Sequence, residues 1–221
     1  MKFRQLHRWD VSLEEAAEIQ RDLRRRVALV DGFPELRLVA GVDVCVPAGT
    51  NEGHAAVAIL SLPDFDLVEL RKATRTLTFP YIPGFLSFRE TPVVFAAFEK
   101  VVHVPDVIIV DGQGIAHPRG LGIAAHLGLL LDVPAVGCAK SHLFGVYEEP
   151  GPERGAATPL LDRDEEPVGN VVRTRTGTKP VFVSPGHKVS FESSVRIVLD
   201  CSPKYRLPEP IRAAHRLAAE R

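Results

Sequence analysis

Cysteine is scarce in this sequence, and the three cysteines that it has lie far apart. Cys45, Cys138 and Cys201 match neither a C-x-x-C zinc pattern nor the even-numbered framework of a disulfide-rich protein. We therefore expect three reduced thiols that take no part in the chemistry, in a protein of the cytoplasm.

Long apolar runs are also absent. No uninterrupted apolar stretch reaches the ~20 residues that span a bilayer. The N-terminal sequence MKFRQLHRWD lacks the apolar core of a signal peptide. The sequence therefore predicts a soluble protein that is neither exported nor bound to a membrane.

Neither sign of charge is in excess, because 27 Lys and Arg residues face 28 Asp and Glu residues, for a formal net charge of -1. Such a chain has no overall field that attracts nucleic acid or membranes, so a site for a polyanion must be local or must use metal ions.

The 17 Gly and 18 Pro among 221 residues exclude a low-complexity chain. From this length we expect one domain over residues 1–221. Separately, we expect a monomer.

The periodicity of apolar residues predicts an α/β fold. Ser12 and Glu15 form a capping box in front of a helix at 12–29. Val-, Leu-, Ile- and Thr-rich runs between turn-forming sequences predict consecutive antiparallel strands at 36–46, 55–62 and 67–77. Helices and strands then alternate, with helices at 91–102 (capped by Thr91), 121–131, after Ser190 and after 208–210, and strands at 107–110, 135–138, 168–174 and 180–184. Residues 148–166 are expected to form an exposed loop.

Asp43 is unusual because it lies within an apolar strand sequence, LVAGVDV. A carboxylate that is buried there loses hydration, and it must be protonated, paired or bound to a cation. The alternative is that the alternation of the strand turns Asp43 to solvent, which is the more common situation for a single acid in a strand.

Asp111 follows the apolar run VIIV and begins the sequence DGQG. Open α/β sheets place their sites at the carboxyl ends of such strands, and glycines there let a substrate approach the backbone closely. An Asp-Gly pair alone also marks ordinary turns. Two strand acids together indicate a site for a hard divalent cation such as Mg²⁺, which binds oxygen ligands and typically takes one or two carboxylates.

The segment PYIPGFLSFRE, residues 80–90, supplies a third acid, Glu90. Its prolines fix φ on either side of Tyr81 and Ile82, so these two residues can project as a stiff apolar tip. In a nucleic-acid enzyme such a tip inserts between bases and fills the space of a base that has left the stack. The alternative is a buried loop in which Tyr81 belongs to the core.

Three segments together resemble the endonuclease V family, the deoxyinosine 3′ endonucleases. They are PYIPGFLSFRE, DGQGIAHPRGLGIAAHLGLLLDVPAVGCAKSHLFG and RLPEP, and the likeness extends over nearly the whole chain. The resemblance implies a ribonuclease H-like fold, in which helices flank a mixed sheet made of an antiparallel meander and then parallel strands. It also implies a DNA-repair enzyme that recognises deaminated adenine and uses Mg²⁺, or Mn²⁺ in its place, to hydrolyse the second phosphodiester bond on the 3′ side.

The roles of individual residues follow from the same resemblance. It implies a catalytic metal site made of Asp43, Glu90 and Asp111, the acids that residue type already indicates for a hard cation. It implies a DNA wedge made of Pro80, Tyr81, Ile82 and Pro83. It implies a hypoxanthine pocket built from the backbone near Gly84, Leu86, Gly112, Gly122, Ile123 and Gly137, with His117 and Lys140 close to phosphate. Gln113 departs from the family, in which many members have His, and we expect this to change local contacts more than the metal ligands.

Lys140 and His215 complete the predicted catalytic set. Lys140 can stabilise negative charge at the phosphate, although a single lysine after a strand is more often a surface residue. His215 shares a helical face with Ile211, Ala214 and Ala218, so it should point inward. A hydrogen-bonded core histidine is the alternative for His215; the resemblance instead places it near the active site, where it positions water or assists metal binding.

Two other functions stay open from the sequence. One is an inosine-specific ribonuclease of the same fold, which acts on inosine-containing RNA, because an extruded base does not identify the sugar. The other is a non-cutting module that binds nucleic-acid structure with the same wedge, and the presence of all three acids argues against it. A Ser-His-Asp hydrolase is not indicated, because the sequence has no G-x-S-x-G motif.

Overall fold

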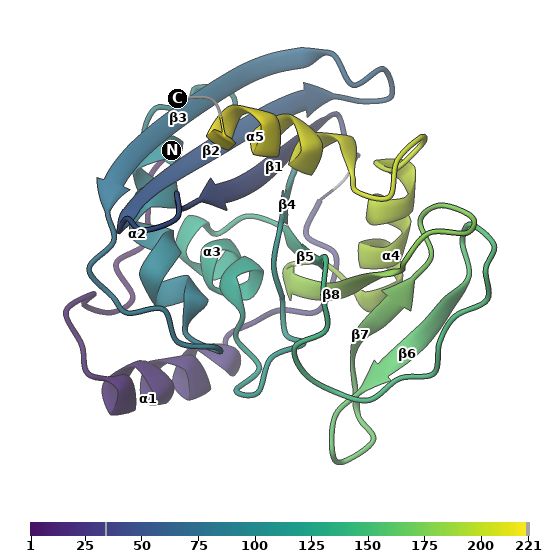
Figure 1. The fold of residues 1–221 in the computed structure, drawn as a ribbon, viewed down its shortest axis with the longest axis horizontal. Coiled ribbons are helices and arrows are strands. Elements are labelled where there is room, and N and C mark those ends of the chain that lie inside the picture. The colour runs from purple at the N-terminus through teal and green to yellow at the C-terminus, as the bar shows by residue number, and fades with distance from the viewer. Residues whose placement is uncertain (34, 220–221) are drawn as a thin grey trace.

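The strands form one mixed sheet in the computed structural model, which describes residues 1–33 and 35–219 (Figure 1). Its strand order is β3-β2-β1-β4-β5-β8-β7-β6. At one edge lies an antiparallel meander of β1 (Leu38–Cys45), β2 (Glu52–Ser61) and β3 (Leu67–Thr76). Next to β1, and parallel to it, come β4 (Val107–Val110) and β5 (Ala135–Ala139). The other half of the sheet is antiparallel and consists of β8 (Val181–His187), β7 (Pro167–Val172) and β6 (Ala157–Leu161).

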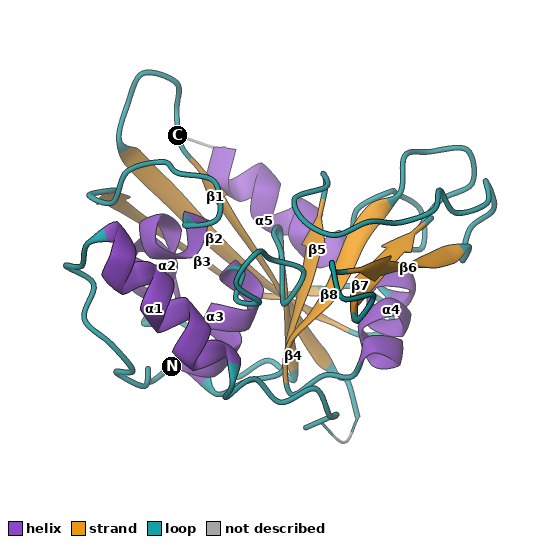
Figure 2. Cartoon of the chain, turned by 90° about the horizontal axis from the view of Figure 1, so that it is seen from below, coloured by secondary structure: helices purple, strands orange, loops and turns teal. Residues whose placement is uncertain are grey.

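Helices cover both faces of this sheet (Figure 2). One face packs against α2 (Leu86–Phe98) and α3 (Ile123–Leu131), and the other against α4 (Phe191–Asp200) and α5 (Glu209–Ala219). The remaining helix, α1 (Leu13–Arg24), lies outside α3 and shares an apolar cluster with it. No helix in the described ranges has the length and apolar character that crossing a membrane requires.

The alternation of β1 decides which of its side chains face which helices. Ala40 and Val42 belong to the apolar core under α2 and α3, whereas Val39 belongs to the core under α4 and α5. Gly41 lies on the α5 side, where an added Cβ would stand 1.9 Å from the carbonyl oxygen of Pro210. Glycine at this position therefore allows α5 to lie directly against β1.

Most of the expected elements are confirmed. The three-stranded meander and the strand at 107–110 occur where they were predicted, and Ser190 caps α4. The capping box of α1 is also present, because Ser12 accepts a hydrogen bond from the backbone of Glu15 and Glu15 accepts one from Ser12. This helix ends at Arg24, earlier than the expected 12–29.

The expected start of the second helix at Thr91 is wrong. This helix, α2, begins at Leu86, and Thr91 lies inside it, with its buried Oγ1 unpartnered among the described residues. The preceding turn is helical because it buries Phe88 and anchors Arg89, whose guanidinium donates hydrogen bonds to the carbonyl oxygen of Phe79 at 2.5 Å and to Asn51 at 3.2 Å. Glu90 is therefore a helical residue and not the end of a loop.

The expected exposed loop at 148–166 is also wrong in part. Residues Ala157–Leu161 form the edge strand β6, which pairs antiparallel with β7. Two of its five residues are exposed, two are half-buried and only Leu160 is buried, so the sequence lacks the apolar run by which a buried strand is recognised. Only the flanks of this segment are irregular.

Candidate active site

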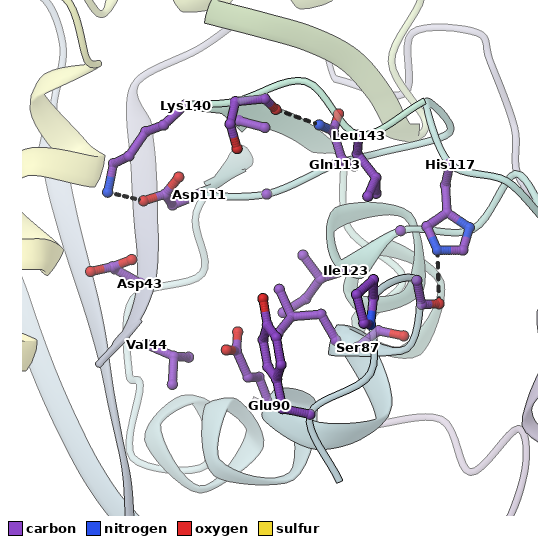
Figure 3. A pocket seen from close by; sticks show the side chains of 18 of the residues that line it. Asp43, Val44, Ser87, Glu90, Asp111, Gln113, His117, Ile123, Lys140 and Leu143 are labelled. Carbon is purple, nitrogen blue, oxygen red and sulfur yellow. Dashed lines mark hydrogen bonds and ion pairs between the residues drawn. The ribbon is translucent and has the colours of Figure 1, made fainter. Parts of the chain in front are cut away.

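A cavity of about 530 Å³ opens at the carboxyl ends of β1, β4 and β5, opposite α2 (Figure 3). Asp43 lines it from β1, Asp111 from the turn after β4, and Glu90 from α2. Because β1 and β4 are parallel neighbours, their carboxyl ends lie together, and the backbone N–H of Asp111 donates to the carbonyl oxygen of Val42 at 3.1 Å. The fold thus brings the three predicted acids, which are far apart in the sequence, to one cavity.

Asp43 is buried and paired with His215. It is 8% exposed, so the alternative of a solvent-facing strand acid is wrong. Its Oδ2 lies 2.7 Å from Nδ1 of His215, which α5 brings to the cavity. A carboxylate only accepts, so a hydrogen bond to it requires the hydrogen on Nδ1, and in the neutral form of the ring Nε2 is then an acceptor. The side chain of His215 is 56% exposed, which excludes the alternative of a core histidine.

Asp111 forms an ion pair with Lys140, the residue that follows β5 (Figure 3). Burial raises the pKa of Asp111, whereas the hydrogen bond and the charge of Lys140 lower it, and the nearby carboxylate of Asp43 raises it again. The net direction is upward. Lys140 is thus bound to an acid of the cavity and is not an isolated surface lysine.

Glu90 has no hydrogen bond and no ion pair with any residue that the structure describes. Burial raises its pKa to about 8, and the negative charges of Asp43 and Asp111 contribute to the rise, while the charge of Arg89 opposes it. Arg89 does not neutralise Glu90 directly, because its guanidinium donates to Phe79 and Asn51. The cavity therefore contains a carboxyl group that lacks a cationic partner.

The chemistry of this cavity fits a hard divalent cation. All three acids offer oxygen ligands, and Glu90 would lack a cationic partner once it is ionised, so a bound cation would supply the missing positive charge. Asp43 and Asp111 are near enough for their carboxyl groups to interact directly. As the side chains stand in residues 1–33 and 35–219, no three His, Cys, Asp or Glu residues are close enough to hold one ion jointly. Metal binding by Asp43, Glu90 and Asp111 together stays a prediction.

The predicted wedge lies at the rim of this cavity. Tyr81 is 73% exposed, so the alternative in which it is a core residue is wrong. Tyr81, Ile82 and Pro83 line the cavity, whereas Pro80 lies at a neighbouring groove. An exposed, proline-flanked tyrosine at the rim of an acidic cavity is suited to contact a ligand that enters it.

The residues predicted for the base pocket are mostly found in the cavity wall. The cavity is lined by Gly84, Leu86, Gly112, Gly122 and Ile123. Gly137 does not line it, and its prediction as a wall residue needs correction. It lies within β5, where an added Cβ would stand 2.3 Å from the backbone nitrogen of Gly114. The absence of a side chain therefore lets the DGQG turn pack directly against β5.

His117 lines the cavity, but both of its ring nitrogens are used by the protein. Nε2 donates to the carbonyl oxygen of Gly84 at 2.9 Å (Figure 3), and Nδ1 accepts from the backbone N–H of Arg119 at 3.1 Å. Burial lowers the pKa of His117 to about 4, so the ring is neutral at pH 7. The phosphate contact predicted for His117 stays a prediction, and it requires one of these hydrogen bonds to be exchanged.

Gln113, the departure from the family pattern, links two segments of the cavity wall. Its Nε2 donates to the carbonyl oxygen of Ser141 at 3.2 Å, so the turn after β4 is tied to the segment after β5 (Figure 3). Its buried Oε1 has no partner in the described part of the chain.

Two residues that the sequence did not single out hold the pocket wall from outside. Gln20 of α1 and Arg119 both donate hydrogen bonds to the carbonyl oxygen of Gly84. Gln20 is fully buried on the same face of α1 as Ala16 and Leu23. A polar side chain on the apolar face of a helix is the signal that could have indicated it.

The fold and the cavity define an α/β protein with an acidic site at the carboxyl ends of parallel strands. Its sequence matches the family model for endonuclease V over residues 21–216. Endonuclease V of Trichormus variabilis is 51% identical over 222 residues, which cover 100% of both chains. The chain belongs to the endonuclease V family.

Solved structures agree with this assignment. Endonuclease V of Streptomyces avermitilis is 42% identical, with a TM-score of 0.90 over 95% of this chain and 92% of that one. Endonuclease V of Ciona intestinalis is 28% identical, with a TM-score of 0.82 over 93% of this chain and 95% of that one. That protein is in complex with a 24mer DNA that contains an inosine followed by a ribo-adenosine. The predicted fold class is confirmed.

Proposed function

We propose that this protein is an endonuclease that recognises deoxyinosine in DNA and, with Mg²⁺, hydrolyses the second phosphodiester bond on the 3′ side of the lesion. The observation that carries the proposal is the meeting of Asp43, Glu90 and Asp111 in one cavity beside the exposed Tyr81, in a chain of the endonuclease V family. Such cleavage begins the repair of deaminated adenine. A single domain and a monomeric state are part of the proposal.

Asp43, Asp111 and Glu90 are the residues that would hold the cation. When bound, Mg²⁺ offsets phosphate charge and supports the formation of hydroxide and the departure of the 3′ oxygen. The protein contributes Lys140, whose ammonium lies at Asp111 and can balance the negative charge of a phosphate placed there. It also contributes His215, whose Nε2 can accept a proton from water while Nδ1–H stays bonded to Asp43.

Selection of the base follows from the backbone of the cavity wall. Hypoxanthine offers an acceptor at O6 and a donor at N1, whereas adenine offers a donor at N6 and an acceptor at N1. A wall built for the first pattern leaves buried groups unpaired with the second, at a cost of ~1 to 3 kcal/mol per group. The backbone groups near Gly84, Leu86, Gly112, Gly122 and Ile123 can therefore discriminate without a charged side chain.

The deciding experiment is a nicking assay on duplexes that carry one deoxyinosine, with Mg²⁺ and with EDTA. We expect one nick, at the second phosphodiester bond 3′ to the lesion, only with Mg²⁺, and none in the matched undamaged duplex. Binding of the lesion duplex without any nicking in Mg²⁺ or Mn²⁺ would instead indicate the non-cutting module.

An inosine-specific endoribonuclease is the second candidate. The nucleic acid bound by the Ciona intestinalis protein has a ribonucleotide directly after the inosine, which shows that this relative accommodates a ribose there. Parallel assays on deoxyinosine DNA and inosine RNA of the same sequence separate the two candidates. A rate on RNA that exceeds the rate on DNA would assign the protein to RNA.

Replacing Tyr81 by alanine is expected to weaken binding of lesion DNA while leaving the stability of the fold nearly unchanged. Stacking of one aromatic ring on a base contributes about 1–3 kcal/mol, so the Kd should rise by a factor of roughly 5 to 150. Because Tyr81 is 73% exposed, its removal leaves no cavity in the core. Fluorescence anisotropy and thermal unfolding measure the two effects, and a large fall in Tm with unchanged affinity would assign Tyr81 to the core.

A further inference from the structure

The carbonyl oxygen of Gly84 accepts hydrogen bonds from three side chains. His117 Nε2 donates at 2.9 Å, Gln20 Nε2 at 3.0 Å and Arg119 Nη2 at 2.6 Å. Gly84 has a φ of +83°, and an added Cβ would stand 2.9 Å from Arg119, so the position favours glycine. This residue directly follows the tip at Tyr81, Ile82 and Pro83. The backbone conformation of Gly84 therefore sets the direction in which the tip projects from the start of α2.

Gln20 connects this point to the opposite wall of the cavity. Its Nε2 also donates to the carbonyl oxygen of Leu121 at 3.1 Å, next to Gly122 at the N-terminus of α3. Its Oε1 accepts from Nε of Arg119 at 2.5 Å, and the guanidinium of Arg119 lies 4.1 Å from the ring centre of Phe85. One buried amide on α1 thus bridges the backbone on the tip side and the backbone on the α3 side.

Gln20 itself is outside the cavity that holds the acids. It does not line that cavity, it is fully buried, and its amide is hydrogen-bonded to Gly84, Leu121 and Arg119 of the polypeptide. A helix surface that only packs needs an apolar residue at this place, since burying an amide costs free energy unless its hydrogen bonds are made. The amide makes three hydrogen bonds, which is a geometric constraint that an apolar residue cannot supply.

We propose that Gln20, together with Arg119, is a positioning residue that sets the spacing between the tip-side and α3-side walls of the base pocket, and thereby the affinity and selectivity for the extruded base. The inference rests on the proposed function. It assigns to α1, which contributes no residue to the cavity, control over the recognition of the lesion. The acids at the other end of the cavity do not contact Gln20, so the chemical step itself should be spared.

The test compares Gln20→Met and Gln20→Glu with the wild-type protein in nicking assays over a range of deoxyinosine-duplex concentrations. Methionine keeps the volume and removes the amide, and glutamate keeps an acceptor for Arg119 but cannot donate to the two carbonyl groups. We expect KM to rise about tenfold in both variants, since each loses the donors to Gly84 and Leu121, with kcat changed less than about twofold. The ratio of the rate on deoxyinosine to the rate on undamaged DNA should fall.

Ser12→Ala provides the matched control on the same helix. Ser12 caps α1 through its side chain and contacts neither carbonyl group, so its loss should lower the Tm without changing KM or selectivity. If either Gln20 variant fails to fold, Arg119→Met, at a partly exposed position, is measured in its place. KM and selectivity equal to those of Ser12→Ala would overturn the proposal, whereas a wild-type protein that does not nick deoxyinosine DNA would overturn the proposed function instead.

Discussion

Replacing Asp111 by asparagine, or Asp43 by asparagine, is expected to abolish Mg²⁺-dependent nicking while leaving the fold intact. Both acids lie at the carboxyl ends of parallel strands, and each keeps an acceptor oxygen for its present partner, Lys140 or His215, when it becomes an amide. What is lost is one negative charge at the predicted cation site. Removal of several kcal/mol of charge stabilisation corresponds to a fall in kcat on the order of 10³-fold or more.

Single-turnover nicking at saturating enzyme measures this loss, and circular dichroism with thermal unfolding shows whether the variants are folded. Asp66→Asn is the matched control, because Asp66 is exposed in the turn between β2 and β3. Its nicking rate should equal that of the wild-type protein. Normal cleavage by the Asp43 or the Asp111 variant would remove that residue from the metal site.

The parts of the fold that were predictable are those where a local pattern and the tertiary environment agree. The run VIIV is apolar throughout because β4 is covered by helices on both faces, and its bounds at 107–110 were correct. The start of α2 was not predictable, because Thr91 followed by Pro92 is a typical helix start. The burial of Phe88 and the hydrogen bonds of Arg89 to Phe79 and Asn51 favour a start at Leu86, and these are contacts with parts of the chain outside the helix.

The residues of the site likewise divide into those that a local pattern could predict and those that depend on tertiary contacts. Asp43 and Asp111 could be singled out because a carboxylate that is buried next to an apolar strand needs a partner. Glu90 lies in a helix, and only the resemblance of its segment to the family indicated its role. The pairing of His215 with Asp43 depends on Gly41, which lets α5 approach β1, and no local pattern reports that approach. The role of Gln20 depends on the carbonyl groups of two distant residues, and backbone acceptors have no signature in the sequence.

Glu90→Gln is expected to remove the pH dependence that Glu90 imposes on the stability of the metal-free protein. The pKa of Glu90 is raised from 4.5 to about 8, chiefly by burial. Between these values the unfolded chain has released the proton that the folded protein still holds, so the free energy of unfolding falls as the pH rises. The loss from this group levels off above the folded-state pKa of about 8, and it amounts to at most about 5 kcal/mol. Glutamine stays neutral, so the variant should be the more stable protein at pH 8 in EDTA and lose little between pH 5 and pH 8 from this position.

Urea unfolding at pH 5 and pH 8, with EDTA or with Mg²⁺, measures the free energy of unfolding of both proteins. The control is Glu99→Gln, at an exposed position just after α2, whose stability should depend on pH as that of the wild-type protein does. Mg²⁺ should restore more stability to the wild-type protein at pH 8 than to Glu90→Gln, because a cation that binds only the folded state stabilises it and ionised Glu90 is part of its predicted site. The same variant should nick deoxyinosine DNA far more slowly in spite of its greater stability. Equal pH profiles for the wild-type protein and Glu90→Gln would mean that Glu90 finds a partner in solution, and the cavity would then lack the uncompensated carboxylate that makes it suited to a cation.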